Sequence, residues 1–154
     1  MNPNAKKFEI KRLRKTDLST FNSLVELFNE VFEEEPKPRS DAYSISLLSN
    51  PSFIAIVAIS NGEVLGGLTA YELPMIYGDY PEIFLYDLAV KPEYQRMGIG
   101  KGLIQSMREY CAQNHIKEFF LMAHEEDEHA IEFYKSTGGK SQKVVNFLYK
   151  IKEY

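Results

Sequence analysis

The stretch that most limits how this chain can fold is PEYQRMGIGKGL, residues 92–103, in which three glycines occupy five positions. It follows a nearly continuous apolar run, EIFLYDLAV (82–90), which is typical of a strand buried on both faces. It leads into residues 98–114, where apolar side chains recur at helical spacing. Because glycine costs about 1 kcal/mol inside a helix, three glycines at a helix start indicate that bare backbone is needed there.

Changes of hydrophobic period along the rest of the chain predict a mixed α/β (α+β) fold. A helix after strand 82–90 brings strand 117–123 parallel to it through a right-handed crossover. Asn61-Gly62 separates two apolar runs and predicts an antiparallel hairpin. We therefore expect one domain over residues 1–154, with a mixed, mostly antiparallel sheet, a central β-α-β unit and helices on both faces. The expected strands are 8–14, 53–60, 64–73, 82–90, 117–123 and 144–151; the expected helices follow Thr16 or Asp17, cover 41–48 and 98–114, and run through 130–134 to a glycine cap at Gly138-Gly139.

Composition narrows the class of protein. The chain has 154 residues and a formal net charge of −4, which argues against a nucleic-acid surface and suits a cationic partner. No run reaches the roughly 18 apolar residues of a membrane span. The start, MNPNAKKFEI, lacks the apolar stretch of a signal peptide, so we expect a cytoplasmic protein with no membrane partner. Cys111 is the single cysteine, and we expect it to be a small buried hydrophobic residue.

The glycine-rich stretch has the chemistry of a phosphate site. The first turn of a helix presents unpaired N–H groups and the positive end of the helix dipole, and a phosphate accepts several such bonds at once. Gly98 and Gly100 leave the backbone open, and Arg96 and Lys101 add charge beside it. Gly102 sits where bulk would crowd either a neighbouring strand or the ligand. The spacing fits neither a P-loop nor a dinucleotide fingerprint.

These residues resemble a known family. LAV-KPEYQRMGIGKGLI is similar to the R/Q-x-x-G-x-G/A segment of the GCN5-related N-acetyltransferases, and AIEFYKSTGG is similar to their A-x-x-x-Y-x-x-x-G-F segment. Gly139 stands where the family usually has an aromatic residue. FIAIVAISNGEVLGGLTAYELP together with EIFLYDLAV resembles the type I aminoglycoside 3-N-acetyltransferases over nearly the whole chain. The resemblance implies transfer of an acetyl group from acetyl-coenzyme A (acetyl-CoA) to a primary amine of an aminoglycoside-type acceptor.

The resemblance also assigns residues to the cosubstrate. It places the pantetheine arm along the backbone of Leu88, Ala89 and Val90, and the pyrophosphate on the loop. Tyr134 matches the family tyrosine that protonates the departing thiolate, and a phenol with a pKa near 10 suits that task; packing beside Phe133 is its other interpretation. The residues expected to bind the cosubstrate are Leu88, Ala89, Val90, Gln95, Arg96, Met97, Gly98, Ile99, Gly100, Lys101 and Tyr134.

The acceptor side is less defined by sequence. Many relatives carry a glutamate after the glycine-loop helix, where this chain has Met122, so Asp87 and Glu82 are the candidate bases. Asp87 either accepts a proton, binds a substrate ammonium, or is bonded to a neighbouring strand, and Tyr86 is expected to line the same pocket. Glu125, Glu126 and Asp127 form either an anionic rim for the acceptor or a charged first helical turn. No metal is implied, because His124 and His129 point roughly 140° apart on a helix.

Three functions are compatible with these features. The first is acetylation of an aminoglycoside. The second is acetylation of another amine, such as a polyamine, an amino sugar or a protein N-terminus. The third is a regulator that binds acyl-coenzyme A without turnover. A second copy of the chain is a candidate partner through the apolar C-terminal segment, VVNFLYKIKEY.

Overall fold

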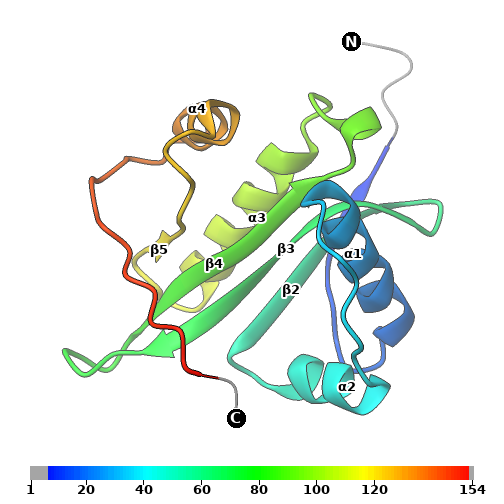
Figure 1. The fold of residues 1–154 in the computed structure, drawn as a ribbon, viewed down its shortest axis with the longest axis horizontal. Helices are drawn as coiled ribbons and strands as arrows, with labels where there is room; N and C mark the ends of the chain where they lie inside the picture. The colour runs from blue at the N-terminus through cyan, green and yellow to red at the C-terminus, as the bar shows by residue number, and fades with distance from the viewer. Residues whose placement is uncertain (1–6, 153–154) are drawn as a thin grey trace. The chain divides into compact units, whose positions relative to one another are not determined.

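The structure, a computed structural model, describes residues 7–152 of the chain. These residues form two compact units that divide between Met122 and Ala123 (Figure 1). No helix of the described residues is long and apolar enough to cross a bilayer. The expectation of one domain over residues 1–154 stays a prediction, and the two units are described separately.

The first unit is a five-stranded sheet in the order β1-β2-β3-β4-β5, carried by three helices (Figure 1). The first four strands pair antiparallel, and β4 and β5 pair parallel, as the predicted crossover requires. This confirms the mixed, mostly antiparallel fold. The elements are β1 (Glu9–Arg12), α1 (Leu18–Val31), α2 (Asp41–Ser49), β2 (Phe53–Ser60), β3 (Glu63–Pro74), β4 (Pro81–Val90), the short 3-10 helix η1 (Pro92–Tyr94), α3 (Ile99–Gln113) and β5 (Phe119–Phe120).

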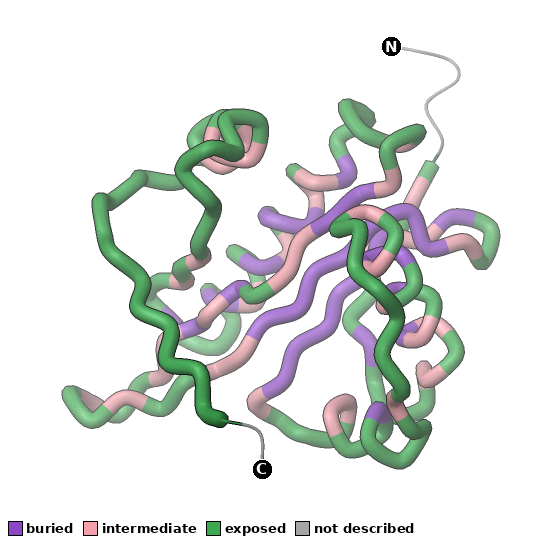
Figure 2. Tube along the Cα trace, in the orientation of Figure 1, coloured by how far each residue is buried: buried purple, intermediate pink, exposed green. Residues whose placement is uncertain are grey.

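Helices cover both faces of this sheet. Side chains of a strand alternate between the two faces, and apolar residues on both faces are buried. Phe53, Ala55 and Val57 of β2 join Leu24 and the other buried residues of α1 in one core cluster. The intervening residues of β2 are also buried, and α3 contacts the sheet on their side. Figure 2 shows the result as continuous burial along the central strands. Cys111 lies buried on α3, as expected.

Two strand predictions are wrong in extent. The strand expected over 117–123 is reduced to Phe119–Phe120, which pairs only with Ile83 and Phe84. Strand β4 was expected to be buried on both faces, yet Tyr86 in its middle is 63% exposed. The early end of β5 leaves the second half of β4 without a neighbouring strand on that edge.

The second unit contains α4 (Glu128–Ser136). Gly138 has a left-handed backbone with φ of 94°; its N–H donates to the Lys135 carbonyl, and the Gly139 N–H donates to the Tyr134 carbonyl. This is the Schellman arrangement that glycine favours, so the predicted glycine cap is confirmed.

The strand predicted over 144–151 is wrong, because these residues form no helix or strand. Their large apolar side chains are exposed, from 74% at Val144 to 84% at Tyr149. A strand needs backbone partners, and among the described residues none pairs with this segment. Apolar alternation alone therefore predicted a strand that forms no backbone pairing among residues 7–152.

Candidate active site

The start of α3 is built to leave backbone N–H groups open. Gly98 is the N-cap and has a left-handed backbone with φ of 84°, which glycine adopts without strain. No side chain caps this helix, and the Gly102 N–H donates to the Gly98 carbonyl at 2.9 Å as its first turn closes. The N–H groups before Gly102 lack acceptors within the helix. A Cβ added at Gly98 would meet no atom within 4 Å, so the space beside this turn is open.

Gly102 has different surroundings from Gly98. A Cβ at Gly102 would lie 3.4 Å from the Phe8 ring and 3.7 Å from Ile10. These are ordinary van der Waals distances, so Gly102 lies beside the first strand without being required there by close packing. The left-handed backbone and the open space at Gly98 account for one of the three clustered glycines.

The loop before α3 is fixed to the end of β4. The Gln95 side-chain amide donates to the Val90 carbonyl at 3.2 Å. Glu63, in the hairpin between β2 and β3, accepts from the Lys91 ammonium at 3.1 Å and from the Tyr94 hydroxyl. Arg96 has φ of 62°, a conformation that costs energy in a residue with a side chain. The loop is thus held in a specific, partly strained shape, with Arg96, Met97 and Lys101 exposed.

The second half of β4 offers an open backbone edge. On one side, Asp87–Val90 pair with β3, whereas on the other side β5 pairs only with residues 83 and 84. The Lys91 N–H donates to the Leu65 carbonyl of β3 at 2.9 Å. Because successive residues of a strand direct their polar groups to opposite sides, Ala89 then faces β3, and Leu88 and Val90 face the open edge. Leu88 therefore presents its N–H and carbonyl outward, whereas Val90 presents its N–H there and its carbonyl accepts from Gln95.

A β-bulge lies beside this edge. Thr69 pairs with Asp87 but Ala70 pairs with Leu85, so Tyr86 is an extra residue in β4. Bulges bend a strand and redirect its side chains. Here the bulge separates the half of β4 that pairs with β5 from the half that is open, and it places Tyr86 and Asp87 at the point of separation.

Asp87 is a half-buried carboxylate with one hydrogen bond. Its Oδ2 accepts from the Thr69 hydroxyl at 2.6 Å, and among the described residues it forms no ion pair. Burial raises the pKa of Asp87, and the Thr69 hydrogen bond partly opposes that shift. A carboxyl group whose pKa is moved toward neutrality is suited to proton transfer. Of its three interpretations, bonding to a neighbouring strand holds, and it leaves Oδ1 for another partner.

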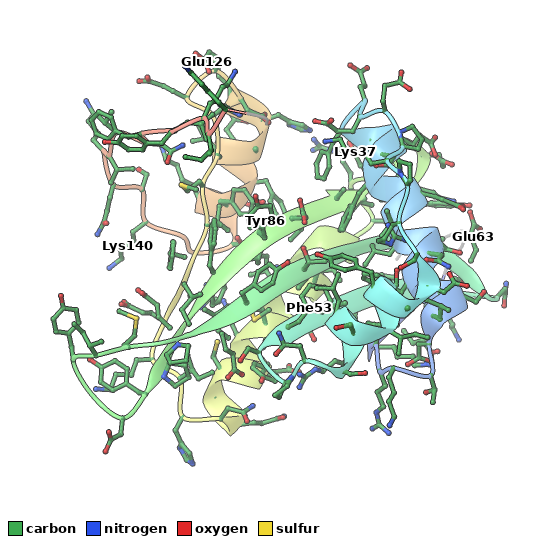
Figure 3. All side chains as sticks on the ribbon, turned by 60° about the horizontal axis from the view of Figure 1, so that its bottom comes forward. Lys37, Phe53, Glu63, Tyr86, Glu126 and Lys140 are labelled. Carbon is green, nitrogen blue, oxygen red and sulfur yellow. The ribbon has the colours of Figure 1, made fainter. Side chains whose placement is uncertain are left out.

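An aromatic row surrounds Asp87 on the face of the sheet that α1 covers. The Tyr71 ring lies 5.3 Å from Phe53 and 6.0 Å from Tyr86, and the Phe84 ring stacks on Phe120 at 4.9 Å (Figure 3). Burial raises the pKa of Tyr71, and Tyr43 and Asp87 add to the shift. Aromatic faces beside a carboxylate attract ammonium groups. The surface can therefore accept a cationic amine.

The other candidate base is not brought to this place. Glu82 lies at the start of β4, opposite Leu73, and the rise of a strand places it roughly 15 Å from Asp87. The structure therefore gathers Tyr86 and Asp87 beside the open edge and leaves Glu82 at the far end of the strand.

In the second unit, Asp127 has a structural task. It is the N-cap of α4 and its carboxylate accepts from the Ala130 N–H at 3.0 Å. Glu125 and Glu126 are exposed in the turn before it. Tyr134 is half-buried, and burial, followed by the charge of Asp127, raises its pKa. A raised pKa keeps the phenol protonated at neutral pH, as a proton donor requires.

Sequence reasoning missed the β3 side of this site. Thr69 and Tyr71 come from the run VLGGLTAYEL, which was interpreted only as a hairpin strand. Both residues occupy alternate positions of one face, and a polar Thr among the apolar residues at the centre of the strand was the available signal. Their register opposite Asp87 depends on the bulge, which no local pattern indicated.

Comparison with known proteins defines the class. A family model described as the acetyltransferase (GNAT) family matches residues 19–138. The chain belongs to the GNAT family of acetyltransferases. Thialysine N-epsilon-acetyltransferase of Sus scrofa is 30% identical over 121 residues, covering 74% of this chain and 69% of that protein. N-alpha-acetyltransferase 60 of Xenopus tropicalis is 23% identical over 129 residues and 73% of this chain, which spans about half (53%) of that relative's length.

Several solved structures of acetyltransferases superpose on this chain. An aminoglycoside acetyltransferase from an uncultured soil metagenomic sample, solved in complex with sisomicin, superposes with a TM-score of 0.91 at 35% identity, covering 94% of this chain and 97% of that chain. A second aminoglycoside acetyltransferase from a soil sample superposes with a TM-score of 0.89 at 33% sequence identity. The match covers 95% of this chain and 99% of that chain. An aminoglycoside N-acetyltransferase in complex with coenzyme A superposes with a TM-score of 0.79 at 19% identity, covering 97% of this chain and 99% of that chain. At this identity the similarity is one of fold.

Proposed function

We propose that this protein transfers the acetyl group of acetyl-CoA to a primary amine of an aminoglycoside-type acceptor. The observation that carries the proposal is the match, over nearly the whole chain, to an acetyltransferase crystallised with sisomicin. The site supports it independently, because open helix amides, an open strand edge and a half-buried carboxylate lie along one strand–loop–helix unit. These are the parts that acyl transfer to an amine requires.

Each part has a chemical task in this proposal. The N–H groups at the start of α3 bind the pyrophosphate of the cosubstrate, and Arg96 and Lys101 add charge. The outward N–H and carbonyl of Leu88 and the outward N–H of Val90 hold the pantetheine arm and orient the thioester. Asp87 accepts a proton from the attacking amine. When the C–S bond breaks, the proton of the Tyr134 hydroxyl passes to the thiolate.

The direct test is turnover of acetyl-CoA with a panel of amines. We expect sisomicin to release free thiol and to gain one acetyl group, detected by a thiol reagent and by mass spectrometry. Background from the protein is low, because the single cysteine, Cys111, is buried and burial raises its pKa. Tyr134→Phe should lower kcat by about 10-fold or more. If no aminoglycoside is acetylated while another amine is, the acceptor assignment is wrong.

A second candidate acceptor is a smaller amine. It is favoured by the match to thialysine N-epsilon-acetyltransferase, whose name describes the side-chain amine of an amino acid. Thialysine, lysine, spermidine and a peptide N-terminus therefore belong in the panel. Acetylation of thialysine in preference to sisomicin would favour this reading. Tight acetyl-CoA binding without turnover of any amine would favour the non-catalytic regulator.

We also propose that a second copy of the chain covers the C-terminal segment. Six large apolar side chains between Val144 and Ile151 are exposed in the single chain, and such a patch is typical of an interaction surface. Sedimentation or light scattering of the purified protein measures this directly. A monomer at all concentrations would contradict the proposal.

A further inference from the structure

We propose that Thr69 is a positioning residue that orients the Asp87 carboxylate so that its free oxygen, Oδ1, faces the acceptor amine. The inference rests on the proposed function and adds a residue that neither the glycine loop nor the family motifs contain. It begins from the register of β3 and β4, in which Thr69 is the partner of Asp87 immediately beside the bulge.

The geometry restricts the carboxylate to one orientation. The Thr69 hydroxyl donates to Oδ2 at 2.6 Å, a length typical of a strong hydrogen bond to an ionised acceptor. Thr69 is 7% exposed, and a β-branched side chain in a strand has few alternative rotamers. Among residues 7–152, no other group hydrogen-bonds to this carboxylate. One oxygen is therefore fixed by a rigid, buried donor, and Oδ1 keeps its capacity to accept a proton.

The groups around Asp87 leave the Thr69 hydrogen bond as the interaction that stabilises its ionised form. Tyr43, Asp87 and Tyr86 each influence the pKa of Tyr71 through their charge. A neutral tyrosine adds no positive charge, and among residues 7–152 no basic side chain forms an ion pair with Asp87. The Thr69 hydroxyl is thus the group that favours the ionised form against burial, which is the larger influence. Removing the hydroxyl should both release the carboxylate and raise the pKa of Asp87.

The test compares Thr69→Val, which keeps the side-chain shape without the hydroxyl, with Thr69→Ser, which keeps the hydroxyl. Carbon-13 NMR of the full chain follows the titration of the Asp87 carboxyl group, identified by its loss in Asp87→Asn. We expect the Asp87 pKa to rise by about one unit in Thr69→Val and to stay near the wild-type value in Thr69→Ser. Equal pKa values in the two variants would overturn the proposal. Thr69→Ala replaces Thr69→Val if the latter does not fold.

Steady-state kinetics of the same variants provide a second test. We expect Thr69→Val to lower kcat about 10-fold with an unchanged KM for acetyl-CoA, and Thr69→Ser to restore it. In an Asp87→Asn background the Thr69→Val change should cost nothing further, because its effect acts through that carboxylate. A full additional loss in that background would overturn the proposal. If wild-type protein acetylates no amine, the proposed function fails, and the NMR titration still decides whether Thr69 controls Asp87.

Discussion

Among single residues, Asp87 is both the proposed general base and a half-buried carboxylate that lowers the stability of the fold. Its pKa in the folded chain is raised by burial above the ordinary value of 3.8. Between 3.8 and the folded value, the native state binds more protons than the unfolded state, so stability falls as pH rises through this window. Above this window the cost to stability is complete, and below 3.8 it is absent.

We predict that Asp87→Asn separates activity from stability. The variant should lose about 100-fold or more in kcat, since it cannot accept a proton. Its melting temperature at pH 7 should exceed that of the wild type, because the penalty for a half-buried charge is removed and the Asn oxygen still accepts from Thr69. The difference should disappear near pH 3.8. Calorimetry at several pH values checks this, and a lower melting temperature at pH 7 would contradict it.

Among the elements, the turn into α3 carries the cosubstrate assignment. The strand β4, the helix η1 and the loop are joined by Gln95 to Val90 and by Glu63 to Lys91 and Tyr94. These contacts hold the amides at the start of α3 in place before any ligand arrives. Binding there should be strong for the same reason that other preorganised sites bind strongly, because little ordering remains to be done.

We predict that Gly98→Val weakens acetyl-CoA binding at least 10-fold in calorimetric titration. The added side chain would occupy the open space beside the helix amides, and the backbone at φ of 84° disfavours a branched residue. Gly62→Val is a matched control: Gly62 has φ of 78°, also meets nothing within 4 Å, and lies in the β2–β3 turn. The Gly62→Val variant should lose a similar amount of stability and keep the wild-type affinity for acetyl-CoA. Equal affinities for both variants and the wild type would refute the pyrophosphate assignment.

For the molecule as a whole, the core of the first unit holds β3 and β4 in the register that the site needs. Leu24 of α1 is fully buried, and the position of a Cβ on Gly67 would be 2.5 Å from its Cδ1. Helix α1 therefore packs directly on the backbone of β3, close to the pairing of Thr69 with Asp87. Loosening this contact affects both stability and the site.

We predict that Leu24→Ala lowers the free energy of unfolding by about 2–5 kcal/mol. Urea denaturation followed by circular dichroism measures it, and the rate at which Cys111 reacts with a thiol reagent should rise in parallel, since this thiol is buried. Leu73→Ala is the matched control, because Leu73 is 37% exposed, and it should cost less than about 1 kcal/mol. Equal losses would show that α1 does not carry the core.

The sequence by itself determined the order and type of most elements, the parallel pairing across α3, the glycine cap at the end of α4 and the burial of Cys111. These follow from local period and from backbone conformations that few residues other than glycine adopt, so a short window contains the information. The predicted C-terminal strand was wrong on the same ground, because residues 144–151 have the local strand pattern but form no strand pairing among the described residues.

Only the tertiary structure decided which polar groups meet. The bulge at Tyr86 sets the register that joins Thr69 to Asp87, and the early end of β5 opens the edge at Leu88 and Val90. A one-residue change in register turns every following side chain to the other face, and no neighbouring residue in the sequence specifies it. The glycine-rich turn is local and could be predicted from the sequence, whereas the pairing of Thr69 with Asp87 depends on strand register.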